Sequence, residues 1–509
     1  MTTLSGKHSG ANRLAVAAAS VLTLAVAGCA VGPDFMRPDP PRVEGYLEKS
    51  AAAPAHEYPA GDDAQRFVTG MDIPGQWWTL FHSQPLNELI DQAFKANPDL
   101  QAAQAALRSA RETLHAGQGA ALPGIDAGFQ PTRQKISAGT VSSSAANGAA
   151  IYNLHTAQVS VGYAPDLFGG VRRGIESLHA QSEFQRFQLE AAYLSLASNV
   201  ANAAVQEASL RGQIAATREI IGIDKKLLEM LQRQHSLGES TMADIAIQEA
   251  ALAQVQATLP ALEKQLAQQR DMLAVLAGRF PGEEQAARFD LASLQLPRTL
   301  PLSLPSKLVS QRPDVRAAEE NLHSASAQVG IATANRLPGI TLSATLGSTA
   351  YEISQLFNAG TGFWMLAGGL AQPIFHGGSL LHQQRAAEAA YEQAAAQYRG
   401  TVLSAFREVA DTLHAIQADS NAYNAALAAQ RAAEKSLLIA TRQLELGDIS
   451  RMTLLLARQS CLQARLNVVQ AQANRLGDTI ALFQALGGGW WNRSDSLASD
   501  RQGETGNGG

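Results

Sequence analysis

The sequence contains little of what many secreted or catalytic proteins depend on. Its 509 residues include only two cysteines, Cys29 and Cys461, and aromatic residues make up 6%. If Cys29 is modified, no intramolecular disulfide can form, so packing has to stabilise the fold. The chain also has no glycine-rich phosphate loop, no nucleophile elbow and no His-Glu-x-x-His pattern, and we therefore expect no enzymatic activity.

Charge and histidine spacing exclude further classes of function. The net charge of −5 gives no reason to expect a nucleic-acid partner. The histidines are scattered without partners at metal-ligand spacing, so neither a metal nor another bound cofactor is expected. What the chain does have is 46% hydrophobic residues, rich in alanine and accompanied by glutamine and leucine. This composition favours long helices that pack closely.

Residues 1–28 have the form of a signal peptide. Lys7 and Arg13 precede an apolar run that is too short to span a membrane as a mature helix. The run ends in VAGC, whose last residue is Cys29, and this resembles the lipobox of bacterial lipoproteins. The resemblance implies that Cys29 becomes the first mature residue and carries covalent diacylglycerol and an N-acyl lipid. Ala30 follows instead of aspartate, which in the common sorting rule favours the outer membrane.

The two ends of the mature chain are expected to lie outside any core. Residues 29–72 begin with a proline-rich stretch and have few large apolar residues, which indicates an extended arm and a surface linker. Residues 491–509 are polar and rich in glycine, and we expect a disordered tail.

The sequence between these ends is duplicated. LPGI occurs at 122–125 and again at 337–340, and NPDL at 97–100 is matched by RPDV at 312–315, in both cases 215 residues later. Leu-Gly turns at 237–238 and 446–447, and LAG at 276–278 with LGG at 486–488, keep nearly the same spacing. We therefore predict two copies of one unit, over 73–300 and 301–490.

Each copy is predicted to contain two strands between helices. Apolar and polar residues alternate, which is typical of strands that lie between two unlike environments. Helical periodicity covers the rest, and one helix in each copy is about 100 Å long at 1.5 Å per residue. Each long helix turns and returns along itself as a coiled-coil pair. The expected strands are 124–135, 154–166, 339–349 and 363–375, and the expected helices are 86–118, 170–236, 241–278, 304–335, 378–445 and 450–486.

Four strands with an apolar face cannot stay open in a bilayer, because each unpaired backbone group would cost several kcal/mol. Four strands are also too few to close a barrel. Three chains would supply twelve strands, a number within the range of outer-membrane barrels, with the polar faces lining a wet lumen. The same threefold assembly would bundle the long helices into a hollow cylinder.

Several short motifs, in this order, resemble the outer-membrane factor (TolC-like) family and most closely its OprM/NodT-type lipoprotein branch. The resemblance covers about 29–490. The motifs are VGPDF at 31–35, WWTLF at 77–81, NPDL at 97–100, DLFG at 166–169, RPDV at 312–315, PIF at 373–375, FREVAD at 406–411 and LGGGW at 486–490.

The resemblance implies an α+β membrane protein in the cell outer membrane. It implies a homotrimer with a shared 12-stranded transmembrane β-barrel and an α-helical tunnel that extends into the periplasm. The implied function is that of the exit duct of a tripartite efflux system, which conducts small molecules such as drugs passively. The implied partners are outer-membrane lipid, a periplasmic adaptor (membrane fusion) protein and an inner-membrane transporter, expected to be of the RND type.

The resemblance also assigns roles to the tips of the helical hairpins. The turns contain the adaptor contacts expected in this family, and the return helices contain the gate. At 454–459 this chain has LLLARQ where related channels commonly have LLDAQR, so Leu456 stands where an acid would be. A leucine ring would constrict the pore by dewetting. The alternative is that the leucines at 454–456 belong to the coiled-coil seam. The expected adaptor contacts are Gly238, Glu239, Ser240, Gly447 and Asp448, and the candidate gate residues are Asp244, Met452, Leu456 and Gln459.

The repeated LPGI phrase marks the predicted junctions between helix and barrel. Pro123 and Pro338 would end the helices, and Gly124 and Gly339 would let the chain bend. Two alternatives stay open. The same fold could serve protein or peptide secretion, or the chain could be a non-porous periplasmic coiled-coil lipoprotein, which would leave the alternating strands unexplained.

Overall fold

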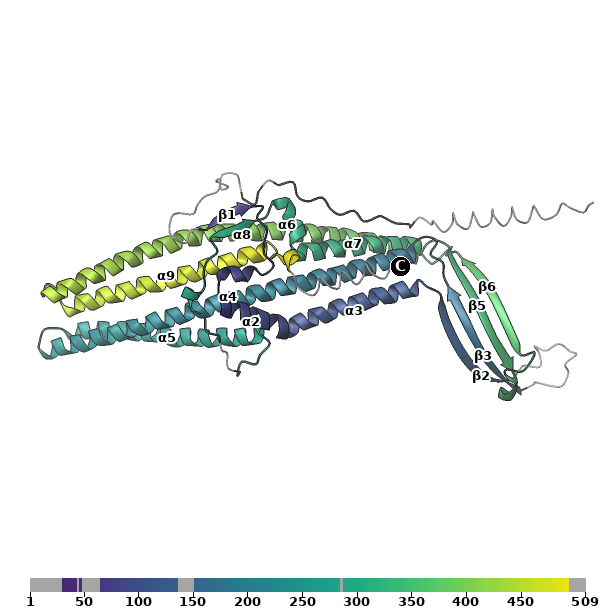
Figure 1. The fold of residues 1–509 in the computed structure, drawn as a ribbon, viewed down its shortest axis with the longest axis horizontal. Helices are drawn as coiled ribbons and strands as arrows, with labels where there is room; N and C mark the ends of the chain where they lie inside the picture. The colour runs from purple at the N-terminus through teal and green to yellow at the C-terminus, as the bar shows by residue number, and fades with distance from the viewer. Residues whose placement is uncertain (1–29, 44, 48–64, 136–150, 284–286, 494–509) are drawn as a thin grey trace, which may run out of the picture. The chain divides into compact units, whose positions relative to one another are not determined.

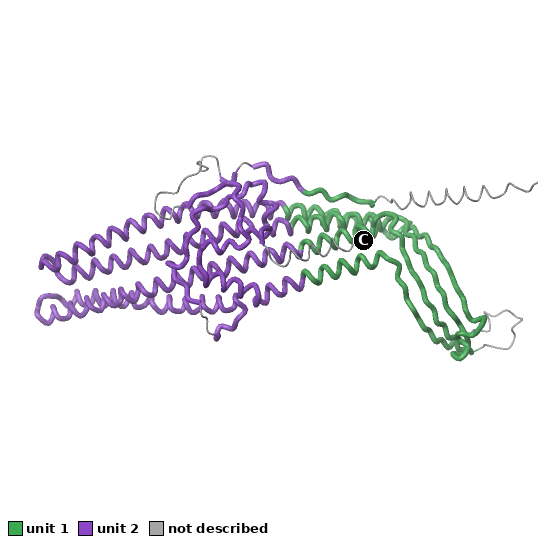
Figure 2. Tube along the Cα trace, viewed as in Figure 1, with its two compact units in different colours: residues 1–37, 107–184, 318–398 green, residues 38–106, 185–317, 399–509 purple. Residues whose placement is uncertain are grey.

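The computed structural model describes residues 30–43, 45–47, 65–135, 151–283 and 287–493 (Figure 1). The chain forms two compact units (Figure 2). Unit 1 comprises residues 1–37, 107–184 and 318–398, and unit 2 comprises residues 38–106, 185–317 and 399–509. Each sequence repeat contributes to both units, so the units do not correspond to the two repeats.

Helices form most of the described chain. The four long helices agree with the sequence prediction to within two residues at each end. In the described residues, no helix combines the length and the apolar character needed to cross a membrane. The helices are α2 (Gln84–Ala96), α3 (Pro98–Ala120), α4 (Gly170–Ser236), α5 (Met242–Leu276), α6 (Pro305–Gln311), α7 (Pro313–Ala334), α8 (Ser379–Leu446) and α9 (Arg451–Ala485).

The expected single helices over 86–118 and 304–335 are each two helices. The first breaks at Asn97 and the second at Arg312, and each break is followed by a proline that starts the next helix. Proline has no N–H to donate and its fixed φ suits the first helical turn, so it ends one helix and begins another.

The strands of unit 1 form one antiparallel sheet. Its order is β2-β3-β5-β6, so two hairpins are joined between β3 and β5. The strand bounds differ from the predicted ones by at most four residues. They are β2 (Gly124–Lys135), β3 (Ile151–Tyr163), β5 (Gly339–Ala350) and β6 (Gly362–Ala371). A 3-10 turn, η4 (Ile353–Gln355), lies in the β5–β6 connection.

Unit 2 contains a two-stranded parallel sheet that the sequence did not predict. β1 (Arg66–Thr69) lies in the segment expected to be a surface linker, and it pairs with β4 (Thr299–Leu302). Strands of four residues are too short for a recognisable alternation. The pairing fastens the start of the first repeat to the sequence between the repeats.

Aromatic residues anchor the core of unit 2. The 3-10 turn η1 (Trp77–Phe81) places Trp77, 1% exposed, flat against Phe483 of α9, with ring centroids 5.2 Å apart. Trp78 contacts Phe94 of α2 edge-on. Two further 3-10 turns, η3 (Leu291–Ser293) and η5 (Trp490–Asn492), lie before β4 and after α9.

Candidate functional site: a two-faced sheet and two helical tips

The four-stranded sheet of unit 1 has an apolar face. Residues that pair directly across antiparallel strands point to the same face, and Val159, Leu346 and Trp364 form one such row. The alternation predicted for the strand at 339–349 is confirmed by this register. The large side chains exposed on the apolar face are Ile125, Phe129, Ile151, Val159, Tyr163, Leu342, Leu346, Trp364, Leu366 and Leu370.

The opposite face of the same sheet is mainly polar. Thr156 and Thr349, which are paired across β3 and β5, place their hydroxyl oxygens 3.2 Å apart on it. A sheet with one apolar and one polar face is suited to form a wall between the hydrocarbon of a membrane and an aqueous lumen. The polar residues of this face include Asp126, Gln130, Thr132, Thr156, Gln158, Ser160, Thr341, Ser343 and Thr345.

The sheet is open at both sides. β2 and β6 are its outermost strands, so within the described residues each has one edge that pairs with no other strand of the chain. In hydrocarbon, unpaired backbone groups cost several kcal/mol each. The two edges therefore require pairing with other chains before the sheet can lie in a membrane.

The predicted junction residues lie at the starts of strands. β2 begins at Gly124 and β5 at Gly339, directly after Pro123 and Pro338. Neither glycine has a positive φ, and a Cβ added at either would meet open space. The bend at the junctions thus does not depend on a backbone conformation reserved for glycine.

The hairpin tips of unit 2 carry the same turn in both repeats. Gly238 follows α4 with φ +79°, and Gly447 follows α8 with φ +80°. The next amide in each turn, that of Glu239 or Asp448, donates to a carbonyl five residues earlier at 2.8 Å. This is the Schellman C-cap, in which glycine takes the left-handed position. Both turns leave a leucine, Leu237 or Leu446, more than 70% exposed.

Asp244 has a role that the sequence analysis did not assign to it. Thr241 and Asp244 form a capping box at the start of α5, with Thr241 N donating to Asp244 Oδ2 at 2.9 Å. The hydrogen bonds from the backbone and side chain of Thr241 lower the pKa of Asp244. At the equivalent end of α9, Ser450 accepts from Thr453 N at 3.2 Å and no acid is used. Ser240 adds an anchor to the first tip by donating to Leu231 O at 3.0 Å.

The other gate candidates are spaced four and three residues apart along one face of α9 but differ in exposure. Leu456 is 50% exposed, whereas Met452 is partly buried against a cluster of Ile220, Leu227 and Leu462. Gln459 is intermediate in exposure. Of these three residues, Leu456 therefore has the most exposed apolar side chain.

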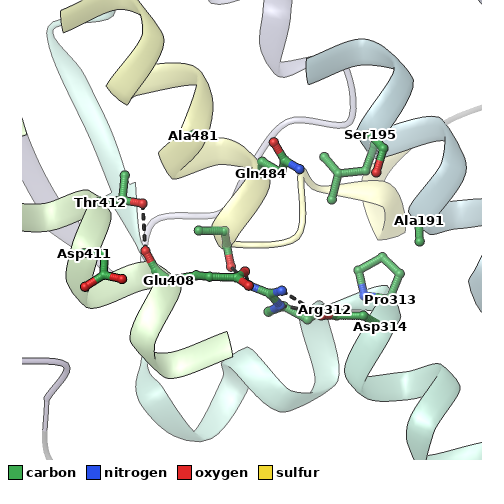
Figure 3. A pocket seen from close by; sticks show the side chains of 12 residues that line it. Ala191, Ser195, Arg312, Pro313, Asp314, Glu408, Asp411, Thr412, Ala481 and Gln484 are labelled. Atoms are coloured by element: carbon green, nitrogen blue, oxygen red, sulfur yellow. Dashed lines mark hydrogen bonds and ion pairs between the residues drawn. The ribbon is translucent and has the colours of Figure 1, made fainter. Parts of the chain in front are cut away.

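A cavity of about 470 Å³ in unit 2 surrounds a buried arginine that comes from the RPDV motif (Figure 3). Arg312 Nη2 lies 2.6 Å from Asp314 Oδ2, and Nη1 lies 2.7 Å from Glu408 Oε2. Nη1 also donates to Ala485 O at 3.1 Å. The two carboxylates raise the pKa of Arg312 against the effect of burial. The motif arginine thus joins α7, α8 and α9 and is already satisfied by protein groups.

A pair of aspartates between α8 and α9 was not predicted from the sequence. Asp478 shares a hydrogen bond with Asp419, and burial together with the Asp419 carboxyl raises the pKa of Asp478 to about 7. The two residues are 59 positions apart, so no spacing rule could have paired them. In the described part of the chain no cluster of three or more His, Cys, Asp or Glu could hold a metal ion.

The family model for outer membrane efflux proteins matches residues 89–279 and 304–488. The chain belongs to the outer membrane efflux protein family. The match falls in two parts, which correspond to the two sequence repeats.

Named relatives and solved structures agree with this assignment. The chain is 30% identical over 434 residues to the pyoverdine export outer membrane protein OpmQ of Pseudomonas aeruginosa, covering 84% of this chain and 89% of that protein. It is similar to the structure of the outer membrane protein VceC of Vibrio cholerae, with TM-score 0.74 and 28% identity over 82% of this chain and 100% of VceC. The outer-membrane channel OprN gives TM-score 0.79 and 25% identity, covering 91% of this chain and all of OprN.

These findings confirm the main sequence predictions. The fold class is that of the outer-membrane channels, with long helices that form a tunnel and strands that contribute to a shared barrel. The protein resides in the outer membrane and is the outer-membrane component of an efflux system. Its family is one of outer-membrane efflux channels.

Proposed function

We propose that three copies of this chain form a passive duct that carries small molecules, such as drugs or toxic compounds, out through the outer membrane. The observation that carries the proposal is the two-faced sheet with two open edges. If β6 of each chain pairs with β2 of the next, no edge strand is left unpaired. The three sheets then form a closed barrel of twelve strands with a polar lumen. Closure by symmetry requires the same joint at each of the three interfaces.

The partners follow from the helical tips and from the relatives. Three chains present six glycine turns with exposed leucines, and these turns are the surface that a periplasmic adaptor meets. An inner-membrane transporter of the RND type supplies the energy, since the duct itself is passive. Relatives are named for pyoverdine export and for toluene efflux, which favours small molecules as cargo.

A lipid on Cys29 anchors the start of each chain. Cys29 lies outside the described residues, but the arm that follows it is held firmly within unit 1. Arg173 Nη2 pairs with Asp34 at 2.6 Å, Phe35 stacks on His323 at 4.3 Å, and Arg37 Nε pairs with Glu319 at 2.8 Å. These contacts support an arm that leads from a membrane-attached residue. Palmitate incorporation that is lost in Cys29→Ala would test the anchor separately from the duct.

The duct is tested by purifying the full chain from outer membranes. We expect heat-resistant trimers on a gel and ion conductance in planar bilayers. A non-porous coiled-coil lipoprotein would show neither property, and this result would refute the proposal. Conductance combined with export of peptides instead of small dyes, in cells that also produce the partners, would favour the secretion alternative.

A further inference from the structure

On β6, the polar face of the sheet contains two large apolar side chains, Phe363 and Met365, and Leu154 of β3 also lies on this face, opposite Thr132. Phe363 is paired with Gly347 and Met365 with Thr345, so both lie on the face opposite Trp364. Met365 is 54% exposed and Trp364 is 74% exposed. Apolar residues on a face that lines water are not required for insertion into lipid, so these two residues call for another explanation.

Phe363 is seated on the sheet by the glycine opposite it. A Cβ at residue 347 would lie 2.8 Å from Phe363 Cζ and 2.6 Å from Ala157 O, so only glycine leaves room for the ring. Phe363 is in consequence partly buried, whereas its neighbours along β6 are exposed. The ring of Phe363 covers the backbone of β5 at Gly347, and this contact fixes the orientation of the ring on the lumen face.

An acidic residue lies on the same row of the sheet as Met365. Asp126 pairs with Ser160, Ser160 with Thr345, and Thr345 with Met365. Four adjacent strands about 4.8 Å apart place the two ends of this row roughly 14 Å from each other. Asp126 is the one acidic residue in the sequences of β2, β3, β5 and β6. The basic residues of β2, Arg133 and Lys135, lie on the opposite, apolar face of the sheet.

We propose that Phe363, Met365 and Asp126 form a binding site for lipophilic aromatic cations in the barrel lumen. The proposal rests on the proposed function, because three chains are needed to close the lumen around the site. Joining β6 of one chain to β2 of the next brings the apolar pair toward the partner's acidic row. Each barrel would contain three such sites.

The chemistry of the three side chains fits this class of ligand. An aromatic ring attracts a cation through its quadrupole, and a thioether makes favourable contacts with aromatic rings. A carboxylate exposed in the lumen adds long-range attraction for positive charge. Since each contribution is small, binding is weak enough for a solute to leave, as conduction requires.

The test uses a reporter cysteine inside the lumen of the full chain. Thr345→Cys, in a Cys461→Ala background, places a thiol opposite Met365 and leaves Phe363 and Gly347 intact. Intact cells are labelled with a charged, membrane-impermeant maleimide, with and without tetraphenylphosphonium. The Cys461→Ala parent gives the background labelling, and Leu346→Cys, one residue away on the apolar face, should react far more slowly.

We expect tetraphenylphosphonium to slow labelling of the Thr345→Cys reporter. Adding Phe363→Ala should weaken this protection roughly threefold, and adding Asp126→Asn should weaken it for the cation but not for neutral triphenylphosphine oxide. Trp364→Ala is the matched control, because it removes an adjacent aromatic residue from the other face and should leave protection unchanged. Met365→Thr should also weaken protection while the Phe363–Gly347 contact is retained, so the test does not depend on a variant that disturbs the sheet.

The outcomes separate this site from the duct. A reporter that reacts from outside but is not protected, or is equally protected in all variants, overturns the binding site and leaves the duct intact. A reporter that does not react, in chains that run as heat-resistant trimers, contradicts the lumen itself and the proposed function with it.

Discussion

Asn97 and Arg312 stand at equivalent places in the two repeats and make the same connection with different side chains. Asn97 Nδ2 donates to Leu276 O at 3.1 Å, and Arg312 Nη1 donates to Ala485 O at 3.1 Å. Leu276 and Ala485 are the last residues of α5 and α9. In each repeat the helix break is therefore tied to the end of the returning helix.

Replacing Arg312 should destabilise the fold strongly. Arg312→Ala leaves Asp314 and Glu408 without their partner and frees the Ala485 carbonyl, and we expect a loss of about 2–4 kcal/mol. The measurement is the midpoint of thermal unfolding by circular dichroism. Arg407→Ala is the control, since the Arg407–Asp411 pair is 3.8 Å apart and about 70% exposed, and it should cost at most about 1 kcal/mol. Equal shifts for both variants would contradict the bridging role of Arg312.

Gly487 should not tolerate a side chain. It has φ +92°, and a Cβ would lie 2.4 Å from Gln311 O, as a Cβ at Gly278 would lie 2.4 Å from Ala96 O. Gly487→Ala is expected to cost about 2–3 kcal/mol from strain and collision together. Gly119→Ala, in α3 with open space around it, should be neutral or slightly stabilising. Comparison of the two unfolding midpoints checks this, and a Gly487→Ala protein as stable as Gly119→Ala would refute it.

The Asp478–Asp419 pair should make stability depend on pH. The folded-state pKa of Asp478 is about 7, against 3.8 for an ordinary aspartate. The folded chain therefore holds a proton that the unfolded chain has released, and its stabilising effect is full below pH 4 and is lost as pH rises through 7. Asp478→Asn should raise the unfolding midpoint at pH 8 and change it little at pH 5.

The control for this pH dependence is Asp271→Asn, which replaces an exposed aspartate in α5. It should have the same effect on the unfolding midpoint at both pH values. If Asp478→Asn behaved like Asp271→Asn, the aspartate pair would not be sharing a proton.

Shortening Leu456 should widen the tip. If three copies of this half-exposed leucine constrict the pore by dewetting, Leu456→Ala will raise single-channel conductance in planar bilayers roughly twofold or more. Leu438→Ala, which removes another exposed leucine from α8, serves as the control and should leave conductance unchanged. Conductance of Leu456→Ala equal to that of the parent would remove Leu456 from the gate.

Local signals account for the parts of the fold that were predicted. Strict alternation and flanking proline and glycine placed the strands to within four residues, and uninterrupted helical periodicity placed the long helices. The helix breaks at Asn97 and Arg312 had a signal in the prolines that follow them, which was not used. Contacts between distant segments, such as β1 with β4 or Asp478 with Asp419, depend on tertiary register and had no local signal.

The open edges of β2 and β6 have a genetic consequence. A chain whose β6 edge cannot pair leaves a gap in any barrel that contains it, since each joint of the ring occurs once per subunit. If such a variant were produced in equal amount with the normal chain, only about one trimer in eight would contain three normal chains by random mixing. Substitutions that prevent the strand edges from pairing should therefore behave as dominant. Substitutions that change only the lumen, in a barrel that still closes, should reduce transport in proportion to the number of variant chains in each trimer.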